Sequence, residues 1–185
     1  IFSLDSEGSV VFKKQWPAFL LAFVLPVVLV YAWWGGFRTA TVSETEGGPY
    51  RFAYLDYEGP ISGMRKTQRA ASQAFVKSKI PAGDTFTVVL TDPRSASGNV
   101  RAQVGYTLAA NAKLPTGLKE GTIARRPVLA VNIQAAILLA PSKAYQVLHE
   151  HMQRQGGDIR MPTVEIYRPA AKVSQMGVFT LEMQR

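Results

Sequence analysis

The run PAFLLAFVLPVVLVYAWW, Pro17–Trp34, contains no charged side chain. As a helix it would rise by roughly 27 Å, which is close to the roughly 30 Å hydrocarbon core of a lipid bilayer. Trp16 precedes the run and Trp33 and Trp34 end it, and such aromatic rings prefer the membrane interfaces. The sequence therefore predicts one transmembrane helix over residues 17–37.

The residues on either side of the run predict its orientation. Two lysines precede it closely, whereas only one arginine, Arg38, follows at a similar distance. Because lysines and arginines near a span favour the cytoplasmic side, we expect the N-terminus inside and the following domain outside. This describes a single-pass protein of a bacterial inner membrane with its domain on the periplasmic side. The expected interface residues are Lys13, Lys14, Trp16, Trp33 and Trp34.

A buried core helix and a cleaved signal peptide both fit the apolar run less well. A core helix of a soluble protein is rarely this long and this apolar with aromatic ends. A cleaved signal peptide ends in a small-x-small motif, and Arg38 occupies the position two before Ala40. Pro26 lies in mid-run, where a membrane helix tolerates a kink. We therefore expect the segment to be retained as an anchor.

The remaining residues divide into a leader at 1–16, a linker at 38–49 and one domain at 50–185. The linker is polar and ends in Gly47-Gly48-Pro49, a composition typical of a flexible tether. The chain has 21 Lys and Arg against 13 Asp and Glu, which favours anionic partners. It has no cysteine, which excludes a disulfide scaffold, a zinc–thiolate site and a thiol nucleophile.

Residues 50–185 show the hydrophobic patterns of an α+β domain. Alternating or β-rich segments predict strands, and apolar side chains at three- and four-residue spacing predict two helices. The order is strand-helix-strand-strand, repeated once, which indicates a duplicated β-α-β-β domain with helices on one side of an antiparallel sheet. The predicted strands are 51–57, 85–90, 100–108, 128–133, 163–167 and 178–183, and the predicted helices are 61–79 and 141–157.

The order and spacing of three short motifs resemble the GyrI-like, or effector-binding, domain family. These motifs are YLDYEGP at Tyr54–Pro60, VGY at Val104–Tyr106 and MPTVEIY at Met161–Tyr167. The apolar run before the domain is similar to the membrane-anchored branch of this family, typified by an animal reticulophagy receptor. That receptor carries its partner-binding motif in a long C-terminal tail. This sequence ends at Arg185, so the receptor role is not expected to carry over.

The resemblance implies a ligand pocket between the two repeats. In soluble relatives an acidic residue and several aromatic residues line this pocket and bind cationic, apolar ligands. The matching positions here are Tyr54, Tyr57, Tyr106, Glu165 and Tyr167. The alternative is that Glu165 pairs with a nearby cation of the chain and that the tyrosines belong to the core.

No motif of the sequence independently indicates catalysis. Some relatives hydrolyse strained small molecules with a glutamate, so a hydrolase remains a minor alternative. His149 and His151 are two residues apart, which is not the zinc-binding spacing on a helix. The apolar run offers no histidine to a haem. We therefore expect no metal, no cofactor and no enzymatic activity.

Basic side chains follow one face of the first predicted helix. Their partners would be anionic lipid headgroups or an acidic neighbour, and the alternative is a solvated face. Aromatic residues are not interleaved with them in a nucleic-acid-binding motif, so we expect no nucleic acid. The residues are Arg65, Lys66, Arg69, Lys77 and Lys79.

Two functions from different classes follow from these features. The first is a non-catalytic accessory or scaffold subunit of an integral-membrane complex, of the respiratory or photosynthetic type. It would contact other membrane subunits through its span and its basic face. The second is a membrane-anchored binder or sensor of a lipophilic cation or a tetrapyrrole, which would use the pocket between the repeats.

Overall fold

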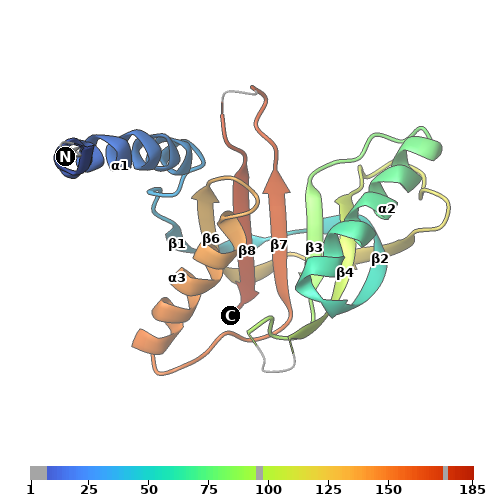
Figure 1. The fold of residues 1–185 in the computed structure, drawn as a ribbon. Helices are drawn as coiled ribbons and strands as arrows, with labels where there is room; N and C mark the ends of the chain where they lie inside the picture. Colours follow the sequence, from blue (N-terminus) through green and yellow to red (C-terminus); the bar gives the residue numbers. More distant parts are fainter. Residues whose placement is uncertain (1–7, 95–97, 173–174) are drawn as a thin grey trace, which may run out of the picture. The chain divides into compact units, whose positions relative to one another are not determined.

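The computed structural model describes residues 8–94, 98–172 and 175–185 (Figure 1). At 8–15 and 17–19 it describes the helical backbone only, so the predictions for Lys13 and Lys14 lie outside the described side chains. The chain divides into two compact units between Phe37 and Arg38. Each unit is described by itself.

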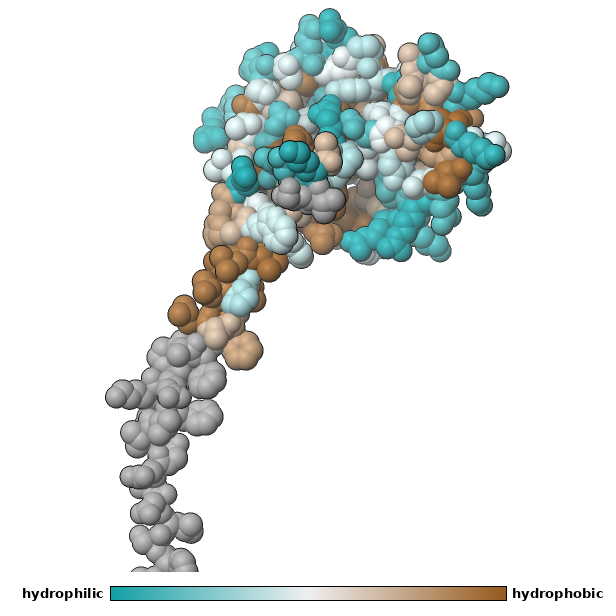
Figure 2. All heavy atoms as spheres, turned by 90° about the horizontal axis from the view of Figure 1, so that it is seen from above, coloured by the Kyte–Doolittle hydropathy of each residue, from teal (hydrophilic) through white to brown (hydrophobic). Residues whose placement is uncertain are grey.

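The first unit is helix α1, Gly8–Trp33, which confirms a helix over most of the apolar run. Every residue from Leu20 to Trp34 is exposed, and the described atoms of this helix present a largely hydrophobic surface in Figure 2. Within the described part of the chain, however, no helix has both the length and the apolar character that crossing a membrane requires. The transmembrane helix is therefore not confirmed and stays a prediction.

The second unit is built on one antiparallel sheet of eight strands in the order β1-β6-β8-β7-β3-β4-β2-β5. The strands are β1 Thr41–Gly47, β2 Tyr50–Pro60, β3 Thr85–Val89, β4 Asn99–Thr107, β5 Lys119–Ile123, β6 Arg126–Gln134, β7 Thr163–Arg168 and β8 Val178–Gln184. The helices are η1 Ile61–Gly63, a 3₁₀ turn, α2 Met64–Lys77 and α3 Ala140–Arg154.

The predicted duplication is confirmed. The first repeat is β2-α2-β3-β4 and the second is β6-α3-β7-β8. From the junction of β7 and β3, the order runs outward as β3-β4-β2 on one side and β7-β8-β6 on the other. The two repeats therefore meet at one strand pair, with corresponding strands at corresponding places.

Two strands were not predicted. Strand β1 lies in the segment 38–49, which is therefore not the flexible linker that its composition indicates, and β5 lies in a segment for which we predicted neither a strand nor a helix. Each forms one edge of the sheet, where β1 pairs with β6 and β5 pairs with β2. Both are mostly polar, so they show little of the apolar periodicity on which the prediction depends.

The sheet is curled. Strands β1 and β2 lie near opposite edges, yet only Gly48 and Pro49 separate them in the chain. On the inner face, Phe52 from β2 contacts Phe86 from β3 with 4.6 Å between ring centroids. The acid Glu182 on β8 is also buried there, accepts a hydrogen bond from Tyr50 and lies 3.5 Å from the Arg126 guanidinium.

Helices α2 and α3 both pack on the other face of the sheet (Figure 1). Helix α2 buries Ala71 and Phe75 against β2 and β4. Helix α3 buries Tyr145, Leu148 and other residues against β6 and β8. The central strands β7 and β3 thus lie between the two helices.

Candidate functional site

Strand β7 presents a different set of side chains to each face of the sheet. Val164 and Ile166 belong to the apolar cluster of the inner face, together with Phe86. Because side chains alternate along a strand, Glu165 and its neighbours two positions away face the helices. Tyr145 of α3 confirms this orientation, since its hydroxyl oxygen lies 2.8 Å from Thr163 Oγ1. Glu165 therefore lies on the helix side, at the junction of the two repeats.

Glu165 has mostly apolar or weakly polar neighbours. Across the sheet it lies opposite Thr87 of β3 on one side and Leu181 of β8 on the other, and both are buried. Its own side chain is half-buried. None of the ion pairs formed by the described residues involves it. The expectation that it pairs with a cation of the chain is therefore not met in this part of the structure.

The environment of Glu165 favours its neutral form. Loss of solvent raises the pKa of its carboxyl group to about 7, and a hydrogen bond with Tyr145 partly opposes this rise. Burial, followed by the charge of Glu165, raises the pKa of Tyr145, so its hydroxyl stays protonated as a donor. Near neutral pH the carboxyl group is thus balanced between its charged and neutral forms, and a bound cation would shift this balance.

Glu182 is a buried acid of the same sheet, and it differs from Glu165 because it has a cation nearby. It is 4% exposed, yet Tyr50 donates a hydrogen bond to it and Arg126 supplies a nearby positive charge. Burial and the contact with Glu182 raise the pKa of Tyr50 to about 12. Glu182 thus has a guanidinium nearby, although its Oε2 atom accepts no hydrogen bond within the described structure, whereas Glu165 has no cationic partner among the described residues.

Two of the predicted aromatic residues share the face of Glu165. Tyr167, two positions along β7, is half-buried beside the α3 cluster. Tyr106 of β4 meets Phe75 edge to face, with 5.6 Å between ring centroids. Thr85 of β3 lies between the two tyrosines in the register of the sheet.

The other two predicted aromatic residues lie elsewhere. Tyr54 belongs to the inner face, where its ring lies 5.4 Å from that of Phe52. Tyr57 donates its hydroxyl hydrogen bond to the Pro60 carbonyl, at the end of its own strand. The structure therefore does not bring Tyr54 to Glu165, and it directs Tyr57 toward the start of α2.

Sequence reasoning missed two polar groups beside Glu165. It assigned Tyr145 only to the apolar stripe of its helix and did not consider Thr163 as a site residue. A signal was present, because a tyrosine in an otherwise apolar stripe needs a partner for its hydroxyl group.

The five basic residues predicted on the first helix are all exposed. Four of them lie on α2, and Lys79 follows it with a positive φ of 55°. Among the ion pairs of the described residues, none uses any of these five side chains. The surface is therefore available to an anionic partner.

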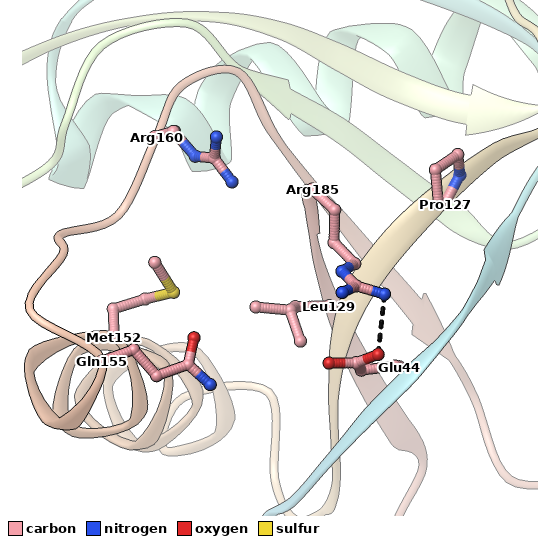
Figure 3. A pocket seen from close by; sticks show the side chains of 7 residues that line it. All are labelled: Glu44, Pro127, Leu129, Met152, Gln155, Arg160 and Arg185. Carbon is pink, nitrogen blue, oxygen red and sulfur yellow. Dashed lines mark hydrogen bonds and ion pairs between the residues drawn. The ribbon is translucent and has the colours of Figure 1, made fainter.

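Two hollows of the second unit lie away from Glu165. One of about 490 Å³ is shown in Figure 3, where Met152 of α3 and Gln155, which follows this helix, face an ion pair of 2.7 Å between Glu44 and Arg185. A larger one of about 730 Å³ is bounded by α2, by Leu55 of β2 and by residues 113–118. We call the larger one the α2 groove.

Comparison with known proteins identifies the fold but not a close relative. No protein-family model matches the chain, and no curated protein matches it. The C-terminal domain of EcmrR matches with a TM-score of 0.60 at 12% identity, over 78% of this chain and 96% of that one. EcmrR in a complex with DNA matches at the same TM-score and identity, over 94% of this chain and 68% of that one.

A third solved structure carries a ligand. SAV2435 bound to tetraphenylphosphonium matches with a TM-score of 0.56 at 11% identity, over 78% of this chain and 93% of that one. Identities this low establish the fold alone. They support the predicted GyrI-like α+β fold and do not show the membrane-anchored branch of that family.

Proposed function

We propose that the domain binds a small, apolar cation at the junction of β7 and β3, with Glu165 as its counter-ion. The observation that carries this proposal is a half-buried carboxyl group without a cationic partner among the described residues. A desolvated carboxylate is costly unless a positive charge is close to it. An apolar cation supplies that charge and loses little hydration when it leaves water.

The side chains around Glu165 fit this class of ligand. Tyr106 and Tyr167 lie on the same face, and the faces of aromatic rings attract cations. Tyr145 favours the ionised form of the carboxyl group without adding a charge of its own. A protein of the same fold, SAV2435, has been solved with the lipophilic cation tetraphenylphosphonium, which supports the proposal by analogy.

Titration of the chain of residues 1–185 with tetraphenylphosphonium by calorimetry tests the proposal. Only the ionised carboxyl group attracts the cation, and its pKa is about 7. The affinity is therefore expected to rise about tenfold between pH 6 and pH 8. Glu165→Gln should remove both the pH dependence and most of the affinity.

The matched control is Glu150→Gln, which changes an exposed glutamate of α3 that accepts a hydrogen bond from Gln146 of the same helix. It should bind like the wild type. Equal binding by the wild type and Glu165→Gln at pH 8 would exclude Glu165 as the counter-ion.

We propose a binding role for this site rather than a catalytic one. The polar groups that we place beside Glu165 are the hydroxyl groups of Thr163 and Tyr145, which lie against each other, and Tyr145 stays protonated. The test is turnover of strained small esters or lactones by the chain of residues 1–185. Hydrolysis that Glu165→Gln abolishes would favour the hydrolase alternative.

We further propose that α1 attaches the domain to a membrane. The support is its continuous exposure of apolar side chains from Leu20 to Trp33. Resistance of the chain to alkaline carbonate extraction tests this, with Leu25→Arg/Leu29→Arg as the variant that should become extractable. Extraction of the wild type would overturn the proposal.

A role as a subunit of a respiratory or photosynthetic complex gains no support from the described residues or from the comparisons. It stays a prediction that depends on what co-purifies with the chain in mild detergent. For the basic residues of α2 we retain anionic headgroups as the proposed partner, at about 1 kcal/mol per charge. Cosedimentation with vesicles of anionic and neutral lipids tests that contact.

A further inference from the structure

The α2 groove has an apolar floor. Leu55, Ala74, Ile80 and Leu118 line it, and all four belong to or pack against the apolar cluster beneath α2. Leu118 is only 7% exposed, so the groove reaches down to core residues. A volume of about 730 Å³ lies within the range of pockets that hold small organic molecules.

Residues 113–118 form the outer wall of the groove, and hydrogen bonds hold the loop at 109–118 that contains them. The Arg51 guanidinium donates to the carbonyl groups of Ala109, Ala110 and Ala112 at 2.8–3.0 Å and pairs with Glu120 at 2.7 Å. Further along the loop, the Thr116 amide donates to Ser78 Oγ at 3.1 Å, which ties the loop to the end of α2. The groove is therefore formed before any ligand arrives.

The charges at the groove are all positive. Lys77 and Lys113 line it, both are exposed, and no acidic residue among the described ones lines it. The acids on the adjacent strands already have partners, because Asp56 pairs with Lys119 at 2.6 Å and Glu120 with Arg51. Within the described residues neither lining lysine forms an ion pair.

We propose that the α2 groove is a second binding site, which takes a small apolar carboxylate. The hydrocarbon body lies on the floor formed by Leu55, Ala74 and Leu118, and the carboxylate lies at the rim between Lys77 and Lys113. This site requires a negative charge, whereas the Glu165 site requires a positive one. The inference rests on the groove alone and does not depend on the function proposed for Glu165.

The probe is 2-naphthoate, titrated by calorimetry into the chain of residues 1–185 in a mild non-ionic detergent. It should bind with one-to-one stoichiometry, and the neutral amide of the same ring system should bind at least about tenfold more weakly. Lys77→Gln/Lys113→Gln should weaken binding of 2-naphthoate by a similar factor. Ala70→Phe, at an exposed position of α2 that lines the groove, should weaken both compounds because the larger side chain occupies space in the groove.

Matched controls separate this site from general charge and from the first site. Lys66→Gln/Lys172→Gln removes the same charge at exposed positions outside the groove and should bind like the wild type. Glu165→Gln should also leave the affinity for 2-naphthoate unchanged. Thermal unfolding of each variant checks that its fold is intact.

Three results would overturn the inference. They are no binding of 2-naphthoate at millimolar concentration, equal affinity of both lysine double variants, and equal affinity of the acid and the amide. In the last case the groove would be only an apolar hollow without selection for charge.

Discussion

The two repeats share one topology but differ in the side chains that their helices direct at the sheet. Helix α3 packs large residues, Tyr145, Leu148 and Met152, into the largest apolar cluster. Helix α2 places alanines at positions such as Ala71 and Ala74, and a groove remains beside it. A hollow lies beside each helix, and the one beside α2, where these alanines lie, is the larger of the two.

The two repeats also differ at the β3–β7 junction where they meet. The first repeat contributes Thr87 and the second contributes Glu165, and these two residues lie opposite one another in the β3–β7 pairing. A scaffold that is nearly symmetric in its backbone thus carries an acid on one side only. The two repeats therefore share their strand arrangement, and a difference at a single position, Thr87 against Glu165, places the acid.

The largest expected effect concerns packing. Leu148→Ala removes a fully buried side chain of α3 and should lower the free energy of unfolding by about 2–5 kcal/mol. Leu114→Ala, at a residue of the α2 groove that is 40% exposed, should cost less than about 1 kcal/mol. Urea unfolding of the two variants measures the difference, and equal losses would contradict the contrast between the repeats.

The second effect concerns the free energy of unfolding as a function of pH. The carboxyl pKa of Glu165 is raised from 4.5 to about 7, so the folded chain holds an extra proton between these values. Stability therefore falls as pH rises through this window, by up to about 3 kcal/mol. Glu165→Gln should be more stable than the wild type at pH 8 and no more stable at pH 4. A parallel pH dependence of the two proteins would contradict the raised pKa.

A smaller effect is expected from Tyr145→Phe. The hydrogen bond of this hydroxyl lowers the pKa of Glu165, so its loss should move the titration of Glu165 to still higher pH. The lost hydrogen bonds should also cost about 1 kcal/mol of stability. NMR titration of the Glu165 carboxyl carbon measures the shift. An unchanged midpoint would mean that Tyr145 does not hold the carboxyl group.

The smallest effect is local to the α2 groove. Arg51→Gln removes the donor that holds the carbonyl groups of Ala109, Ala110 and Ala112. The amides of Ala112 and Leu118, which bond within this loop, should then exchange with deuterium faster. Amides of α3 should be unaffected. Unchanged exchange in the loop would show that the wall of the groove does not depend on Arg51.

Much of the fold could be predicted because periodicity was strong in the elements that pack. The alternation of Val100, Ala102 and Val104 predicted strand β4, and all three residues are buried. Strand β1, TVSETEG, carries no such alternation, and it is held mainly by its backbone pairing with β6. Pairing between segments distant in the sequence leaves little trace in the local pattern of either one.

The site was predicted in part, and the geometry of strands explains what was missed. Tyr54 and Tyr57 are three residues apart on β2, so their side chains point to opposite faces of the sheet and cannot share one pocket. The resemblance selected Glu165, but it did not reveal that Tyr145 lies against it. That contact joins α3 to β7 and depends on tertiary packing.

The pairing of β1 with β6 also determines how a pulling force would travel through the protein. Strand β1 follows the apolar helix in the chain, yet it is bonded to β6, which belongs to the second repeat. Tension on residues 38–40 would therefore load the repeat that carries Glu165 before it reaches β2 and the first repeat. Mechanically, the N-terminal segment is attached to the far half of the domain, although it is adjacent in sequence to the near half.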